Sequence, residues 1–139
     1  MPVRDAQGQE NIAVIGFTTD GDVFGGFYRV AVTKQDDFFK DPNVFIFSFE
    51  SHGRCETPQR FVVKEGMSKY ASVKFFKDDS DGCFVIFYGC YGFLLLGNEK
   101  SITWRDHLSN GFEGVEDTTL TGTDIRDFTC SRLVGIQLE

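Results

Sequence analysis

The chain has 139 residues, a length typical of one domain that buries a core without help from metal ions or disulfides. Sixteen Phe residues and an aromatic content of 15% favour a large hydrophobic core. A formal charge of −7, with no cluster of Lys and Arg anywhere in the sequence, argues against direct binding to nucleic acid.

The first predicted elements form a β-hairpin. Strand-like runs over residues 11–17 (NIAVIGF) and 23–32 (VFGGFYRVAV) flank Asp20-Gly21. Asp-Gly is a preferred pair for a tight turn, because Gly adopts a positive φ without penalty. The pair Gly25-Gly26 would weaken a plain strand, so we expect a bulge or a close backbone approach there.

The next segment predicts a short helical turn and then a strand. Residues 33–36 (TKQD) approximate a capping box, which favours a helical turn through residues 38–39. Residues 41–43 (DPN) then end it, because the residue before Pro is disfavoured in the α region. The run over residues 44–49 (VFIFSF) alternates as a strand does, with its three Phe side chains on one face.

The most hydrophobic stretch predicts the centre of the fold. Residues 83–88 and 91–96 read as two strands that meet at Gly89-Cys90, after an acidic turn over residues 78–82. Both strands are apolar on both faces, so we expect them in the middle of a sheet with other layers packed on it.

Shorter runs complete the pattern. Residues 60–64 and 71–76 predict two further strands, residues from Asn98 onward a long irregular connection, and residues 127–138 a closing strand. Seven or eight short strands with one or two short flanking helices are typical of a mainly β protein, a two-layer antiparallel β-sandwich.

We expect a single domain over residues 11–139. Residues 1–10 are polar and aperiodic, and we expect them to be disordered or to cap the edge of a sheet. An uncapped edge strand invites pairing with another chain, so a homodimer is the alternative.

No catalytic or metal-binding pattern stands out in the sequence. There is no G-x-S-x-G elbow, P-loop or G-x-G-x-x-G, and only two His residues occur. His52 and Cys55 would supply two zinc ligands where a closed site needs four, and residues 78–82 do not fit an EF-hand loop. We therefore predict no catalytic residue, no metal and no cofactor.

Cysteine is the one chemical option. No N-glycosylation acceptor and no apolar run near the length of a membrane span occurs, so we expect free thiols in a reducing compartment, the cytoplasm. Cys55 follows His52 and Arg54 in a loop, where a cation would lower a thiol pKa, and is the candidate redox residue. The other three cysteines lie in apolar runs and are expected to be inert.

Four stretches of the chain occur in the order found in one family. The first is Phe24-Gly25-Gly26-Phe27 after the hairpin turn, followed by Asp41-Pro42-Asn43 and its strand, and the second is Gly89 to Gly97 around Gly92. The third is a late loop with Ser101, Trp104 and Phe112-Glu113-Gly114, and the fourth is Phe128 to Ile136. This series resembles the signature of TLDc domains, the oxidation-resistance family. The resemblance covers residue 11 to the C-terminus, and relatives carry a further helix and strand before it, so this domain resembles a shortened member. Its closing strand has Val134 where relatives carry an acidic residue.

The resemblance implies a sandwich of two antiparallel sheets and no established catalytic activity. Relatives confer resistance to oxidative stress, several bind the vacuolar proton-pumping ATPase, and most are cytosolic. We therefore expect a non-enzymatic protein-interaction domain, with the peripheral subunits of that pump as partner. The alternatives are a thiol-dependent antioxidant acting through Cys55 and a transcription regulator acting through partner proteins. The candidate interaction residues are Phe24, Gly25, Gly26, Asp41, Pro42, Asn43 and Gly92, with structural roles in turns and close packing as the alternative reading.

Overall fold

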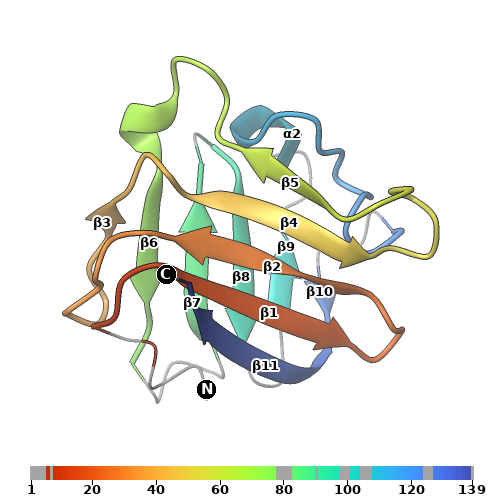
Figure 1. Cartoon of the computed structure of the whole chain (residues 1–139), viewed down its shortest axis with the longest axis horizontal. Helices are drawn as coiled ribbons and strands as arrows, with labels where there is room; N and C mark the ends of the chain where they lie inside the picture. Colours follow the sequence, from red (N-terminus) through yellow and green to blue (C-terminus); the bar gives the residue numbers. More distant parts are fainter. Residues whose placement is uncertain are drawn as a thin grey trace.

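The computed structural model describes residues 6, 8–77, 83–89, 91–97, 101–103, 108–123 and 127–138, and these form two antiparallel sheets packed face to face (Figure 1). The first sheet has the strand order β11-β1-β2-β4-β5. Its strands are β1 (Ile12–Thr18), β2 (Val23–Tyr28), β4 (Phe45–Glu50), β5 (Gln59–Val62) and β11 (Cys130–Gln137). The predicted mainly β, sandwich-like fold is confirmed.

The second sheet has the order β10-β9-β8-β7-β6-β3. Its strands are β3 (Phe39–Lys40), β6 (Ser72–Phe75), β7 (Cys83–Tyr88), β8 (Phe93–Gly97), β9 (Ser101–Thr103) and β10 (Asp127–Phe128). The predicted pair β7 and β8 does lie in the middle of a sheet. A 3-10 turn at Ser68–Tyr70 and the one-turn helix α2 (Leu108–Gly111) connect strands.

The core lies between the two sheets. Alternate residues of each strand point inward, and the largest fully buried side chains include Phe24, Tyr28 and Phe87. Tyr28 packs edge-on against Phe75 with ring centroids 5.7 Å apart, which joins β2 of the first sheet to β6 of the second. This shared aromatic layer keeps the first sheet in a fixed position over the second.

Two adjacent glycines in β2 permit close packing on opposite faces of the first sheet. A Cβ atom at Gly26 would lie 2.5 Å from the Phe87 ring, which comes from the second sheet. A Cβ atom at Gly25, on the other face, would lie 1.9 Å from the Val14 carbonyl oxygen and 2.9 Å from Phe47. The predicted close backbone approach is therefore present at Gly25, whereas the close neighbour of Gly26 is a side chain. The pairing of β2 with β4 also shifts register between Val23 and Phe24.

The hairpin of β1 and β2 is confirmed, but β2 ends at Tyr28 and not at Val32. The reason is a side chain: the carboxylate of Asp41 accepts hydrogen bonds from the backbone amides of Arg29 and Val30. These amides are therefore not available to continue the ladder. The following residues reach the start of the chain, where the Gly8 amide donates to the Val32 carbonyl oxygen at 2.8 Å.

The predicted helical turn after residue 33 is wrong. Asp36 has φ of 63°, its amide donates to the Phe75 carbonyl oxygen at 2.7 Å, and its carboxylate accepts from the Lys77 amide. Asp36 thus binds the end of β6 and does not cap a helix. Phe39 and Lys40 instead form β3, which pairs with β6.

Two other expectations for the second half need correction. The late connection contains β9 and α2, so it is less irregular than predicted. The predicted closing strand is divided at Thr129: β10 pairs with β9 in one sheet, and β11 pairs with β1 in the other (Figure 1). The acidic turn over residues 78–82, Cys90, Trp104 and His107 lie outside the described residues.

Burial raises the pKa of Tyr28 above its ordinary value of 10, because the fold disfavours the charged phenolate. In the unfolded chain the phenol loses its proton above pH 10, whereas in the folded chain it keeps it. Stability therefore falls as the pH rises above about 10. Urea midpoints from pH 8 to 11 should show this fall, and Tyr28→Phe should reduce it.

The same variant loses the hydrogen bond from the Tyr28 hydroxyl to the Ala6 carbonyl oxygen, 3.2 Å in the wild type, which is worth about 1 kcal/mol at neutral pH. An unchanged pH dependence in Tyr28→Phe would show that other groups produce the fall.

Candidate functional site

The side of the first sheet that faces away from the core is apolar. Antiparallel sheets usually place polar side chains on such a face, because it meets water. Here alternation and register bring together residues that we call the outer face: Ala13, Ile15, Phe17, Phe27, Phe45, Phe47, Phe49, Arg60, Val62, Arg132, Val134 and Ile136. Phe49, Val62 and Ile136 are each more than 40% exposed. An exposed apolar surface of this kind is typical of an interaction site.

A groove of about 390 Å³ crosses the outer face. Every strand of the first sheet contributes to its walls, from β11 at one edge to β5 at the other. Three phenylalanines of β4 form its floor, with ring centroids 6.3 Å apart for Phe45 and Phe47 and 4.7 Å apart for Phe47 and Phe49. Phe27 of β2 stacks on Phe45 at 4.8 Å. The rings support one another, so the groove is largely preformed.

A second, more polar hollow of about 430 Å³ adjoins the groove and shares Phe27, Phe45 and Arg60 with it. It adds the exposed side of the turn that follows β3, through Pro42 and Asn43. These two motif residues therefore lie beside the outer face.

Asp41 holds that turn in place from within. Its side chain is fully buried, and one carboxylate oxygen accepts from the Asn43 amide at 2.9 Å while the other accepts from Arg29 and Val30. Three backbone donors on two segments thus share one carboxylate. Asp41 positions Pro42 and Asn43 and is not itself accessible to a partner.

The remaining motif residues face inward or stabilise a turn. Phe24 is fully buried and packs edge-on against Phe128, with ring centroids 5.0 Å apart. Gly92 is buried in the connection between β7 and β8, where its carbonyl oxygen accepts from the Gly89 amide at 2.8 Å. In this conformation Phe24 and Gly92 shape the fold beneath the surface.

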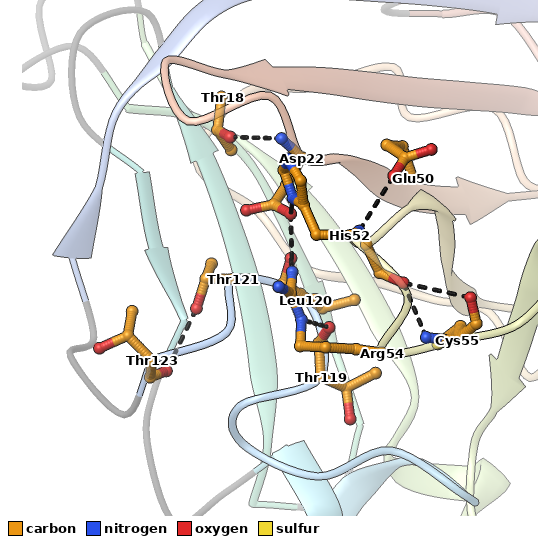
Figure 2. A network of polar contacts seen from close by, with 11 residues as sticks. Thr18, Asp22, Glu50, His52, Arg54, Cys55, Thr119, Leu120, Thr121 and Thr123 are labelled. Carbon is orange, nitrogen blue, oxygen red and sulfur yellow. Dashed lines mark hydrogen bonds and ion pairs between the residues drawn. The ribbon is translucent and has the colours of Figure 1, made fainter.

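The cations that made Cys55 a candidate bind a carboxylate elsewhere. Figure 2 shows His52 and Arg54 converging on Asp22, with the His52 Nδ1 atom at 2.8 Å and the Arg54 Nη2 atom at 2.7 Å from the same carboxylate oxygen. Cys55 is half-buried against the core, and its backbone amide donates to the Ser51 hydroxyl at 2.7 Å. The hydrogen bond with Ser51 therefore fixes the position of Cys55 in the loop, while the two basic side chains face Asp22.

The Asp22 cluster joins three loops. Asp22 lies in the hairpin turn, with its side chain 4% exposed, and Arg54 follows β4. Arg54 also donates to the carbonyl oxygens of Thr119 and Leu120, at 2.8 and 2.9 Å. The Arg54 guanidinium therefore links the turn over residues 116–122 to the loop that follows β4.

Replacing Asp22 with alanine is expected to destabilise the protein by about 2–3 kcal/mol. The change leaves a partly buried guanidinium without its carboxylate, and hydrogen bonds to charged groups are worth about 1.5–3 kcal/mol each. Asp22→Asn keeps one acceptor and should lose less, and Asp20→Ala, a change at an exposed residue of the same turn, is the control. Urea unfolding measures all three; equal stability of Asp22→Ala and wild type would contradict the role of the cluster.

Sequence reasoning missed both the apolar outer face and the Asp22 cluster. The signal for the first was present, because the runs over residues 11–17 and 44–49 are apolar at both odd and even positions. A strand with water on one side should alternate with polar residues. The Asp22 cluster had no such signal, since its members are joined only by the fold.

The described residues form no recognisable metal site. No group of three or more His, Cys, Asp or Glu side chains in this part of the chain could hold a metal ion. None of the described helices is long and apolar enough to cross a membrane. No protein-family model matches the chain, and no curated protein matches it. The likeness to TLDc domains therefore rests on the four motifs and their order.

Proposed function

We propose that this chain is a non-enzymatic protein-interaction domain of the TLDc type, which acts in the cytoplasmic response to oxidative stress. The proposed partner is the peripheral part of the vacuolar proton-pumping ATPase. The observation that carries the proposal is the apolar outer face with its preformed groove. The motif series in TLDc order supports the family and the partner.

The chemistry of the groove favours recognition over catalysis. Its walls are aromatic and aliphatic side chains with Arg60 and Gln59, and they provide no nucleophile and no acid–base pair among the described residues. A thiol mechanism at Cys55 has lost its main support, because His52 and Arg54 are bound to Asp22. The outer face is therefore the better candidate for the functional surface.

A pull-down with the tagged chain tests this function. The bait is incubated with cytosol of its source cells, with and without peroxide, and bound proteins are identified by mass spectrometry. We expect enrichment of the pump's peripheral subunits. Binding should be lost with Phe49→Ser on the outer face and retained with Phe38→Ser, which changes a residue of similar exposure beside the second sheet. Absence of these subunits under every nucleotide and redox condition would overturn the proposal.

A further inference from the structure

We propose that the outer face binds an amphipathic helix of a partner protein, with acidic residues along both flanks of that helix. The inference rests on the proposed interaction function and specifies its surface and its ligand. Apolar side chains of the helix would occupy the groove over Phe45, Phe47 and Phe49, and its carboxylates would pair with Arg60 and Arg132.

The charge pattern of the outer face is the first argument. The chain has a net charge of −7, yet the charged residues among those defined above are two arginines. The register adds the exposed Glu50 opposite Val23 at the end of β4, where its carboxylate accepts from the His52 amide at 3.0 Å.

The Arg60 guanidinium lies 5.4 Å from the centre of the Phe45 ring, and that of Arg132 lies 5.4 Å from the Phe17 ring. Neither guanidinium forms an ion pair with a residue that the structure describes. Both are therefore available to an acidic ligand.

The neighbouring hollow strengthens this pattern. Its charged lining residues, within the described part of the chain, are Arg29 and Arg60. The nearby carboxylate of Asp41 is fully buried and is occupied by three backbone amides, so it does not offset these cations at the surface. A ligand that extends from the groove into this hollow would meet a further basic side chain.

The spacing of the two arginines suits a helix. Arg60 belongs to β5 and Arg132 to β11, at opposite edges of the five-stranded sheet (Figure 1). Four inter-strand steps of about 4.8 Å separate the edges by about 19 Å. A helix with its side chains is about 10–12 Å wide, so a helix that runs along β4 between the two arginines turns one flank toward each of them. Helix on sheet is a standard way to cover an apolar sheet face, and a stripe of residues at i, i+3, i+4 and i+7 would fill the groove.

A second copy of the chain fits this surface poorly. Two outer faces packed together would bury arginines from both copies, and the carboxylate that the register places beside this face, Glu50, already accepts from the His52 amide at 3.0 Å. Burying an unpaired charge is costly, because it loses its hydration without compensation. A self-complementary dimer also requires the same patch to match itself, which a face bordered by arginines at both edges does poorly.

A display selection tests the ligand class. The probe is a library of 18-residue helical peptides with a fixed leucine stripe and randomised flanks, selected on the full chain. We expect the selected peptides to carry Glu or Asp on both flanks and to bind less tightly as salt increases. Basic or neutral flanks among the selected peptides, or no selected peptide at all, would overturn the proposal.

Variants then locate the binding surface. With a selected peptide, Phe49→Ser and the double variant Arg60→Glu/Arg132→Glu should each weaken binding at least tenfold. The double variant should also prefer a peptide in which Lys replaces the acidic residues. Lys69→Glu, an exposed change on the other sheet's side, should leave binding unchanged. Equal binding by the double variant and wild type would overturn the assignment.

Two further results distinguish a helix ligand from a second copy of the chain, and the helix proposal from the proposed function. Light scattering after gel filtration should show a monomer, whereas a dimer that dissociates in Phe49→Ser would assign the outer face to a second copy and overturn the helix. If the pull-down enriches the pump subunits but the display selection yields no peptide, only the helix proposal is overturned. If both experiments fail, the proposed interaction function is overturned together with the helix proposal.

Discussion

Replacing Gly26 with alanine is expected to destabilise the protein by about 3 kcal/mol, which lowers the melting temperature by about 10 °C. The added methyl group would lie 2.5 Å from ring atoms of Phe87, a residue with no exposed surface. Neither the added methyl group nor the Phe87 ring can move aside, because the contact lies in the packed layer between the two sheets. Urea and thermal unfolding of the variant measure the effect.

A double-mutant cycle with Phe87→Ala identifies the cause. Phe87→Ala alone should lose about 3–5 kcal/mol, so all four proteins are compared in trimethylamine N-oxide, which stabilises each of them. In the Phe87→Ala background the Gly26→Ala change should cost almost nothing, because the ring that it meets is gone. Full additivity of the two losses would contradict a clash with Phe87.

Gly25→Ala provides the contrast within the same strand. Its methyl group would meet the backbone carbonyl oxygen of Val14 at 1.9 Å, besides the Phe47 ring at 2.9 Å. Shortening Phe47 cannot move a carbonyl group that belongs to β1, so Phe47→Ala should fail to rescue Gly25→Ala. The same two glycines are part of the TLDc-like motif, and these experiments measure the part of their role that lies in packing.

Local patterns predicted the parts of the fold that local forces determine. Asp20-Gly21 between two apolar runs specified a hairpin, since a turn and its flanking strands are adjacent in sequence. The alternation in residues 44–49 placed three phenylalanines on one face, and the continuous apolar run placed β7 and β8 in mid-sheet. In each case the physical cause lies within about ten residues.

The errors occurred where a distant contact overrode a local preference. Thr33 to Asp36 resembles a helix cap, but the amide of Asp36 binds Phe75, almost 40 residues later in the chain. The sequence around Thr129 gives no sign that a strand ends there. The residues before Thr129 nevertheless pair with β9, and those after it pair with β1 in the other sheet. Neither partner can be identified from the sequence around the site.

The same distinction applies to the candidate site. The phenylalanines of β4 were recognised as one face, but only the fold shows that this face points outward and that Arg60 and Arg132 border it. Cys55 was chosen for two cations next to it in sequence, and the fold directs both toward Asp22. Adjacency in sequence therefore gave the composition of the loop but not the direction of its side chains.

Replacing Asp41 with alanine is expected to destabilise the protein by about 3–4 kcal/mol. The change leaves the amides of Arg29, Val30 and Asn43 without their acceptor at a position with no exposed surface. Each lost hydrogen bond of this kind is worth about 1–1.5 kcal/mol. The loss should appear as a lower urea midpoint with an unchanged slope, since the same surface is exposed on unfolding.

Asparagine at the same position tests whether both carboxylate oxygens are needed. One oxygen of Asp41 accepts from Asn43 and the other from Arg29 and Val30, so an amide side chain satisfies one group and turns its NH₂ toward the other. Asp41→Asn should therefore fall between wild type and Asp41→Ala. Asp37→Asn, at an exposed residue paired only with Lys34 in the described structure, is the matched control and should change stability by less than about 0.5 kcal/mol.

The neighbouring residues Pro42 and Asn43 complete the comparison. Both are exposed at the hollow beside the outer face, so Asn43→Ala should leave most of the stability intact. If this turn contacts the partner, Asn43→Ala should weaken the pull-down although the protein remains folded, whereas Asp41→Asn should weaken it only as far as it unfolds the turn. Equal binding by Asn43→Ala and wild type would restrict the role of Asp41-Pro42-Asn43 to the fold, and recognition would then rest on the groove alone.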